Sequence, residues 1–365
     1  MKRITHTVCM SAVVLLWAAL TAFAWFAPAK DISEAERRPL TQFPEITGES
    51  LLDGSFMADF ESYSLDQFPL RDTFRTIKSL FHFNALNQSD NNGIYITDGF
   101  AVKQEYPLHP DSLYHAAERF NHLYEKYLTD SNVYAAFIPD KGQYLAQDSG
   151  HLSLHFGKLN TILMDRMPWA TGINLYDSLS AEDYYYTDIH WRQEKLFNAA
   201  AVICDALGVT APNPEDYTLT ALERPFYGVY YGQAALPMEP ETMYILESDL
   251  LSQCRVYDYE SGQYTDVYNM DKLSSRDLYD VFLSGSRSLL TIENPNASTD
   301  RELIIFRDSF GSAMAPLLAA DFAKVTLVDI RYIQIDVLDR FLEFHGQDVL
   351  LLYSVPVLNN SQTIK

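Results

Sequence analysis

The stretch that decides the fold is Leu303-Ile304-Ile305-Phe306-Arg307-Asp308-Ser309-Phe310-Gly311. Four consecutive apolar residues, 303–306, are typical of a strand that is buried on both faces of a sheet. A helix-like stretch follows Ser309, so this serine is expected at a strand-to-helix turn. Such turns lie at the carboxyl-terminal edge of a parallel sheet, where α/β proteins place their sites, and the first N–H groups of the helix can stabilise an oxyanion. Serine is also a preferred helix N-cap, so the local pattern leaves a structural role open.

The same alternation of strands and helices extends in both directions from this stretch. Apolar runs predict further strands at 133–138, 325–328 and 349–353, and apolar residues at helical spacing predict helices at about 110–129, 152–166, 192–207 and 334–344. Helices that flank buried strands indicate a parallel α/β sheet. Residues 217–295 are richer in Tyr, Val and Thr and in turns, and we interpret them as a β-rich insertion.

The N-terminus predicts a membrane anchor. Residues 8–27 carry no charge and are long enough to span a bilayer. A cleaved signal peptide is the alternative, with Ala27-Pro28-Ala29 as a weak cleavage site, but its apolar core is typically shorter. We expect an anchor at 1–29, a polar stalk at 30–48 and an α/β domain at 49–365. Both interpretations place that domain outside the cytoplasm.

Composition excludes several classes of function. The 365 residues include 27 Lys+Arg and 49 Asp+Glu, which gives a net charge of −22. Phosphate contacts need clustered cations, so nucleic acid is not an expected partner. Three cysteines without a CxxC pair make neither a disulfide framework nor a thiol-rich zinc site. His151 and His155 are four residues apart, but no carboxylate at matching spacing completes a site, so we expect no metal and no cofactor.

A second motif supplies an acid and a base. It is Thr187-Asp188-Ile189-His190-Trp191, just before the helix expected at 192–207. Alternate residues of an extended segment face the same way, so Asp188 can orient the ring of His190. An imidazole held by a carboxylate is the general base that a serine nucleophile needs. The alternative is a structural histidine beside a buried tryptophan.

Together the two motifs carry a resemblance. The 187–191 segment resembles the motif of the DHHW family, which is similar to the AlgX/AlgJ-like acetyltransferase domain of the SGNH hydrolase superfamily. Asp308-Ser309-Phe310 resembles the nucleophile block of the same group. Further segments resemble family elements in the same order along the chain: 36–40 with 43–44, 66–71, 138–141, 282–286, 329–332 and 348–351.

The resemblance implies a circularly rearranged SGNH-like, flavodoxin-like α/β fold. It also implies a triad in which Ser309 is the nucleophile, His190 the base and Asp188 the residue that orients the base. The implied chemistry is acyl transfer or ester hydrolysis through an acyl-serine, usually with acetyl groups of a cell-surface polysaccharide. Relatives often work beside a membrane-bound O-acyltransferase that supplies the acetyl group.

Three positions depart from the family pattern. The first His of the motif is Ile189, and Arg307 stands where SGNH proteins usually have Gly. An arginine there is expected to narrow the oxyanion pocket or to meet an acidic substrate. Ser286 stands where an Asn is expected, and the loss of an oxyanion donor costs about 3 kcal/mol.

Further residues complete the candidate site. Asp308, Lys141 and Arg331 follow predicted strands and are candidate substrate contacts. Because of the departures, the sequence leaves two alternatives to an enzyme. One is a catalytically inactive glycan-binding or scaffold protein of the cell envelope. The other is a structural envelope protein in which Ser309 only caps a helix and His190 is only a core residue.

Overall fold

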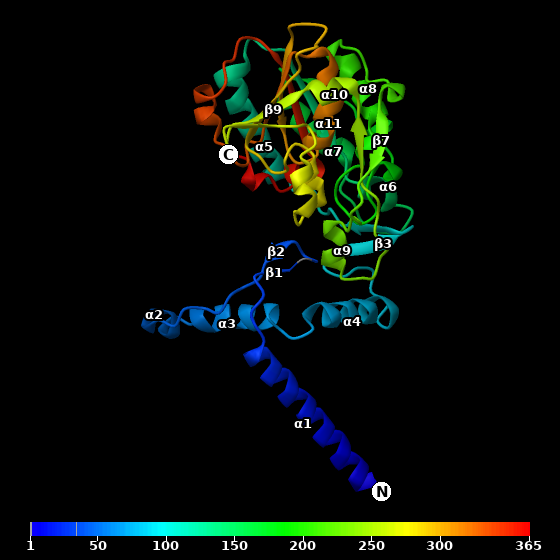
Figure 1. Ribbon diagram of the computed structural model, residues 1–365, viewed down its shortest axis with the longest axis vertical. Coiled ribbons are helices and arrows are strands. Elements are labelled where there is room, and N and C mark those ends of the chain that lie inside the picture. The colour runs from blue at the N-terminus through cyan, green and yellow to red at the C-terminus, as the bar shows by residue number, and fades with distance from the viewer. Residues whose placement is uncertain (1, 34) are drawn as a thin grey trace. The chain divides into compact units, whose positions relative to one another are not determined.

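The computed structural model describes residues 2–33 and 35–365. By their contacts they divide into two compact units, which are described separately (Figure 1). One contains the residues up to Asn92 together with Tyr231–Pro237, and the other contains Gly93–Tyr230 and Met238–Lys365. The boundaries expected at 29/30 and 48/49 stay predictions.

The first unit begins with an apolar helix. Its regular elements are α1 (Lys2–Phe26), β1 (Ile32–Ser33), β2 (Arg38–Pro39), α2 (Gly48–Leu52), α3 (Ser55–Asp66) and α4 (Arg71–Asn84). Within α1, His6–Phe26 has a mean hydropathy of 2.1, and none of its residues is buried in the protein. This segment is long and apolar enough to cross a membrane, and a signal sequence would have the same properties. Beyond α1, the carboxylate of Asp66 accepts hydrogen bonds from Arg38 at 2.6 and 2.8 Å and from the Thr41 N–H at 2.9 Å. This carboxylate therefore ties the segment around β2 to the end of α3.

The second unit is built on an eight-stranded sheet in the order β10-β9-β11-β13-β12-β14-β5-β6. In that order the strands span Gln263–Thr265, Arg255–Asp258, Leu289–Glu293, Lys324–Val328, Glu302–Arg307, Asp348–Ser354, Val133–Ile138 and Thr171–Ile173. The five strands from β13 to β6 are parallel, and β11, β9 and β10 extend them through antiparallel pairings. The strand in the deciding stretch of the sequence is thus β12, the second of the five parallel strands, between β13 and β14.

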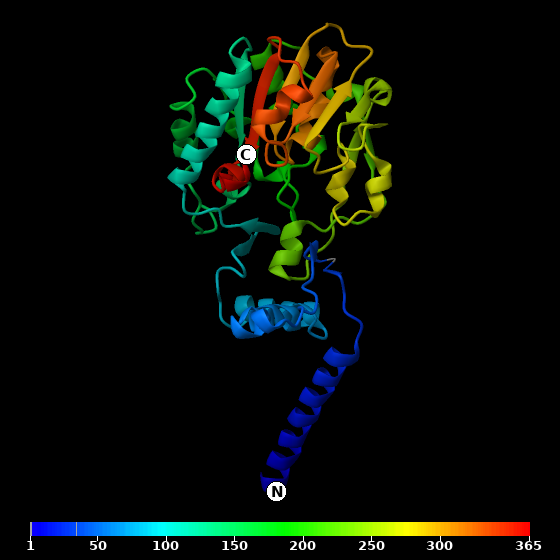
Figure 2. The ribbon, with the colours of Figure 1, turned by 90° about the vertical axis from the view of Figure 1, so that its left-hand side faces the viewer.

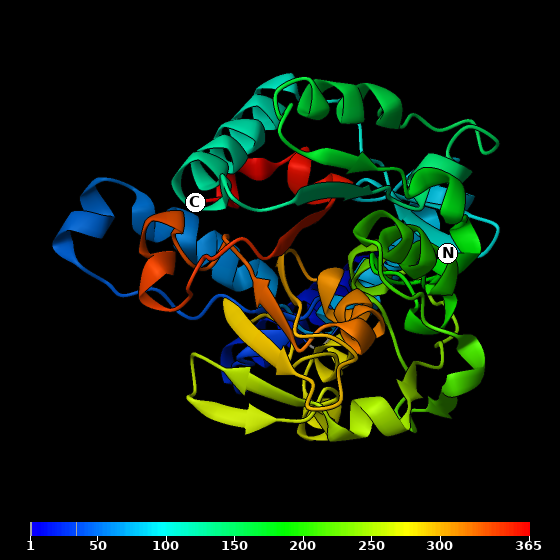
Figure 3. The ribbon, with the colours of Figure 1, turned by 90° about the horizontal axis from the view of Figure 1, so that it is seen from above.

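Both faces of the sheet are covered, which explains the continuous apolar runs (Figure 2). Leu303 and Ile305 of β12 join a core with helices α8 (Phe197–Leu207) and α11 (Gly311–Leu318). Ile304 and Phe306 point the other way, into a core with α5 (Pro110–Leu123) and α7 (Phe156–Met164) (Figure 3). The predicted fold class, an SGNH-like α/β sheet flanked by helices, is confirmed.

Several local predictions need refinement. Residues 217–295 contain five strands and four short helical elements, and β9, β10 and β11 from this stretch join the central sheet instead of forming a separate β-rich insertion. The helix expected at 334–344 is a 3₁₀ helix over Ile335–Arg340. Its two buried residues, Ile335 and Leu338, are three apart, which suits three residues per turn.

The remaining elements are short, and one of them is a π-helical turn that directly follows α5. They are β3 (Ile94–Thr97), β4 (Phe100–Lys103), the π-helix Tyr124–Leu128, α6 (Gly142–Leu145), β7 (Thr218–Ala221), α9 (Val229–Ala234), β8 (Tyr244–Glu247), α10 (Asp249–Gln253), α12 (Val355–Leu358) and 3₁₀ helices at Tyr176–Ser178, Ala181–Asp183, Gln193–Lys195, Pro214–Asp216, Met270–Ser274, Leu278–Val281, Ala319–Asp321 and Ser361–Thr363.

Candidate active site

Ser309 lies in the turn between β12 and α11, at the carboxyl-terminal edge of the parallel strands. The Gly311 N–H donates to the Asp308 carbonyl at 3.1 Å and closes this turn. A Cβ at Gly311 would lie 2.7 Å from the Cβ of Arg307, so only glycine lets the helix start this close to the strand. Ser309 is partly exposed, whereas its neighbours Asp308 and Phe310 are buried. The turn therefore presents one hydroxyl at the surface on a rigid support.

Ser309, His190 and Asp188 form a continuous hydrogen-bonded chain. The Ser309 Oγ lies 2.7 Å from Nε2 of His190, and Nδ1 of the same ring lies 2.6 Å from Oδ1 of Asp188. Asp188 is completely buried, and its Oδ1 also accepts the main-chain N–H of His190 at 3.0 Å. A carboxylate bound to Nδ1 fixes the tautomer whose Nε2 can accept the serine proton. This is the arrangement of nucleophile, base and orienting acid that the sequence predicts.

The loop that carries Asp188 and His190 is held from the insertion side. Glu241 accepts the N–H groups of Tyr186 and Thr187, each at 2.8 Å. The second oxygen of Asp188 accepts the N–H of Val229 at 2.8 Å. A Cβ at Gly228 would lie 2.2 Å from the carbonyl carbon of Thr187, so this close approach requires glycine. These contacts fix the carboxylate before any substrate arrives.

Lys141 holds the same loop from the sheet side. Its side chain is completely buried, and Nζ donates to the carbonyls of Tyr185, Tyr186 and Asp188 at 2.7, 3.1 and 2.7 Å. Burial lowers the pKa of this ammonium, and the charges of Asp140, Asp188 and Glu241 oppose that shift. All the hydrogen bonds of the Lys141 ammonium are thus made to main-chain carbonyls inside the protein. Because the ammonium is buried, it is not exposed for the substrate contact that the sequence suggested.

Two aromatic residues fix the histidine and the nucleophile turn to each other. The ring of Tyr279 stacks on the imidazole of His190, with centroids 3.9 Å apart and planes at 10°. Burial raises the pKa of Tyr279 well above its ordinary value, so it stays a neutral phenol. The indole Nε1–H of Trp191 donates to the carbonyl of Phe310 at 3.0 Å. The segments that carry His190 and Ser309 are therefore joined by this side-chain-to-main-chain hydrogen bond as well as by the contact between His190 and Ser309 themselves.

Replacing Trp191 with phenylalanine should lower kcat for ester hydrolysis by about tenfold, equivalent to about 1.4 kcal/mol. The substitution keeps a ring but removes the donor that ties the nucleophile turn to the base, which also costs about 1 kcal/mol of stability. Trp169→Phe is the matched control, because its indole donates to Asn121 at 2.7 Å in another part of the unit. Thermal unfolding should show a larger stability loss for the fully buried Trp191 than for the partly buried Trp169. Steady-state kinetics of the folded proteins should show a loss of kcat only for Trp191→Phe, and equal kinetics would contradict the link.

The other candidate residues are placed as follows. Arg307 is buried, and its guanidinium donates to the carbonyls of Asp308 and Arg287 at 3.3 and 3.4 Å. It lies inside the protein rather than in an open oxyanion pocket. Arg331 makes a two-point contact with the buried Asp329, at 2.9 and 2.7 Å. Ser286 is exposed, and no hydrogen bond joins it to Ser309 among the residues that the structure describes.

Asp308 supports the nucleophile turn from within. One carboxylate oxygen accepts the Phe310 N–H at 3.0 Å, and the other accepts the Ser354 N–H at 2.7 Å. Because Ser354 ends the neighbouring strand β14, the side chain joins the turn to the sheet edge. Asp308 is completely buried, so its contacts are with the protein and not with bulk solvent.

Comparison with known proteins agrees with this architecture. Residues 172–328 match the family model described as DHHW protein, and this range contains Asp188, His190 and Ser309. The fold is similar to that of a DHHW family protein from Eubacterium siraeum, with 21% identity, coverage of 75% of this chain and 95% of that one, and a TM-score of 0.63.

Two further solved structures are similar over a comparable span. Bacillus cereus PatB1, solved with a sulfonyl adduct, has 17% identity, coverage of 73% and 95%, and a TM-score of 0.56. The O-acetyltransferase domain of Pseudomonas putida AlgJ has 12% identity, coverage of 73% and 92%, and a TM-score of 0.43. No curated protein sequence matches the chain. The family match and the shared fold confirm the resemblance seen in the sequence: residues 172–328 match the DHHW family model, and the α/β fold is similar to that of a solved DHHW family protein.

Proposed function

We propose that the protein is an exported, membrane-anchored O-acetyltransferase or esterase that acts on cell-surface polysaccharide through an acyl-serine at Ser309. The observation that carries the proposal is the chain of short contacts from Ser309 through His190 to the buried Asp188. In this proposal residues 1–29 anchor the protein, 30–48 form a stalk and 49–365 form the catalytic domain.

The geometry supports a two-step acyl transfer. As Ser309 Oγ attacks the ester carbonyl, Nε2 of His190 takes its proton, and Asp188 stabilises the imidazolium that forms. When the tetrahedral intermediate collapses, the leaving alkoxide takes that proton and the acyl group stays on Ser309. A sugar hydroxyl or water then attacks the acyl-serine, with His190 again as the base. Transfer and hydrolysis use the same residues and differ in the acceptor.

Two further observations favour this function. The adduct in PatB1 is of a kind that an activated nucleophile forms with a sulfonyl electrophile, and PatB1 shares the fold. The apolar helix His6–Phe26 supports a site beside a membrane, where a membrane-bound O-acyltransferase would supply acetyl groups. An inactive glycan-binding or scaffold protein is favoured less, because its function would not require both the Ser309–His190 contact and the His190–Asp188 contact to be at hydrogen-bond distance.

Labelling with a fluorophosphonate probe tests the proposal directly. The purified full-length chain in detergent should gain one phosphonyl group on the peptide that contains Ser309, because an activated serine attacks phosphorus as it would attack an ester carbonyl. Ser261→Ala removes an exposed serine outside the site and should label normally. Mass spectrometry that finds Ser309 unmodified while the protein hydrolyses 4-nitrophenyl acetate would reject the acyl-serine.

A further inference from the structure

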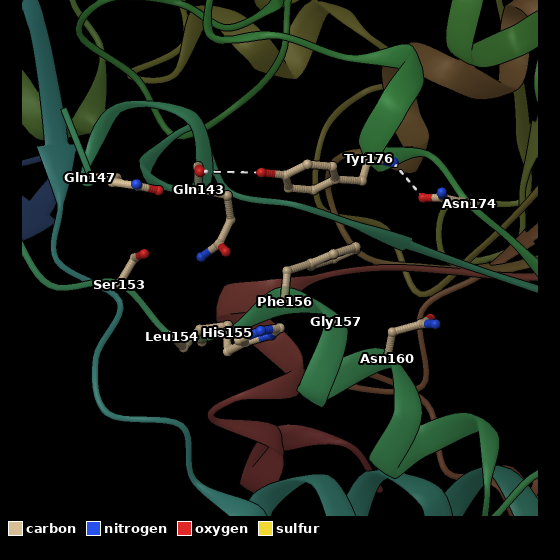
Figure 4. Close-up of a pocket in the computed structure, with 10 residues that line it drawn as sticks. All are labelled: Gln143, Gln147, Ser153, Leu154, His155, Phe156, Gly157, Asn160, Asn174 and Tyr176. Carbon is tan, nitrogen blue, oxygen red and sulfur yellow. Dashed lines mark hydrogen bonds between the residues drawn. The ribbon is translucent and has the colours of Figure 1, made fainter.

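A pocket lies at the same edge of the sheet as Ser309, on the far side of strand β14. It has a volume of about 610 Å³ and is lined by residues that follow β5 and β6 and by the start of α7 (Figure 4). In the sheet, β5 and β6 lie two and three strands from β12. At about 4.8 Å per strand, the pocket is therefore roughly 10–15 Å from the nucleophile along the sheet edge.

The lining of this pocket mixes polar and apolar side chains, and His155 is its one basic residue. Among the described residues that form it there is no Lys, Arg, Asp or Glu. It carries four side-chain amides and two aromatic rings: Gln143, Gln147, Asn160, Asn174, Phe156 and Tyr176. Amides offer both donors and acceptors, which suits a ligand that presents many hydroxyl or amide groups without a formal charge.

One amide in the pocket lacks a partner. The Nε2 atom of Gln143 is buried and makes no hydrogen bond with any described residue. Figure 4 shows this amide pointing into the space between Ser153 and Phe156. A buried donor without an acceptor costs about 1–3 kcal/mol. Because the Gln143 side chain as a whole is partly exposed, a rotation of its amide towards the pocket would let a ligand oxygen accept this hydrogen bond.

The aromatic rings give the pocket a rigid wall. Phe156 stacks on Tyr176, with centroids 5.4 Å apart, and Tyr176 stacks on Tyr144 at 5.0 Å. The Tyr176 hydroxyl donates to the main-chain carbonyl of Gln143 at 3.5 Å, which joins this wall to the unpartnered amide. An apolar wall beside side-chain amides matches a sugar ring, which has an apolar C–H face and a polar rim.

From these observations we infer that the pocket is a subsite for uncharged sugar units of the glycan that reaches Ser309. The inference rests on the proposed function for its substrate and adds the chemical class of that substrate. A polymer of uronates or phosphates would find no Lys or Arg in this pocket and would meet a protein of net charge −22; the one basic residue of the lining, His155, uses its Nδ1 to accept the Lys158 N–H. We therefore expect that the part of the glycan that occupies this pocket, two to three strand spacings from Ser309, is uncharged.

Saccharide binding to the full-length chain in detergent tests this inference. Ligand-observed NMR titrations with chitotriose, cellotriose and trigalacturonic acid should show binding of at least one neutral trisaccharide and weaker binding of the uronate. Gln143→Glu has nearly the same shape but replaces the buried donor by an anionic acceptor, and it should weaken neutral binding at least fivefold. Gln263→Glu adds the same charge on an exposed strand outside the pocket and should bind like the wild type.

The outcomes separate this inference from the proposed function. Should Gln143→Glu fail to fold, Gln147→Glu on the exposed rim serves in its place, with the same expected loss. No binding of either neutral trisaccharide, equal affinity in the pocket variants, or a preference for the uronate would overturn the subsite. Ser309→Ala should keep the affinity for the trisaccharide, so a serine variant that still hydrolyses esters would reject the acyl-serine and leave the subsite standing.

Discussion

Replacing Ser309 with alanine should lower kcat for 4-nitrophenyl acetate hydrolysis by at least about 10³-fold, because the variant lacks the hydroxyl that forms the acyl-serine intermediate. His190→Ala should cost about as much, since an unassisted serine hydroxyl is a weak nucleophile. The two residues act as one unit through the 2.7 Å contact between Oγ and Nε2. The double variant should therefore be no slower than the slower single variant.

Steady-state kinetics of the two single variants, the double variant and Ser261→Ala would check this prediction. Ser261 is exposed, so its variant controls for the loss of a hydroxyl elsewhere and should match the wild type. Losses that multiply in the double variant would show that Ser309 and His190 act independently. Wild-type turnover in Ser309→Ala would remove the nucleophile from the proposal and favour a glycan-binding protein.

Much of the fold follows from features that are local in the sequence. The run 303–306 is apolar at every position because both faces of β12 are covered. The strands at 133–138 and 348–354 can be predicted from their apolar runs for the same reason. Asp188 and His190 are two residues apart, so their contact is also a local property. The pairing of His190 with Ser309, 119 residues away, follows from two sheet-edge positions taken together with the family resemblance.

The supports of the site could not be predicted in this way. Glu241 lies 54 residues from Thr187, and nothing in its neighbourhood marks it as the acceptor for that loop. Tyr279 is one of 24 tyrosines, and only the fold selects it to cover the imidazole. Lys141 lies three residues after the end of β5, which indicates a position near the sheet edge, but its charge alone suggested a surface residue. Its burial depends on hydrogen bonds to the main-chain carbonyls of Tyr185, Tyr186 and Asp188, and these contacts cannot be predicted from a single sequence.

Lys141→Met should lower kcat at least about 100-fold in the folded protein. Methionine fills a similar volume but leaves the carbonyls of Tyr185, Tyr186 and Asp188 without their donor. Leaving buried acceptors unsatisfied should lower the free energy of unfolding by about 3 kcal/mol. The loop would relax towards other donors, and a displacement of about 1 Å in a catalytic group can cost about 10²-fold in rate. Lys141 is thus a positioning residue that acts through Asp188.

The measurement must separate this effect from simple loss of folded protein. Kinetics well below the unfolding midpoint, corrected for the folded fraction, should show a lower kcat with little change in KM, and fluorophosphonate labelling of Ser309 should slow in parallel. Hydrogen exchange should accelerate in residues 185–190 while the β12 and β14 amides stay protected. Lys195→Met is the control, because this exposed lysine lies in the next turn of the same segment. A folded Lys141→Met variant with normal labelling would mean that Glu241 and Val229 hold Asp188 without it.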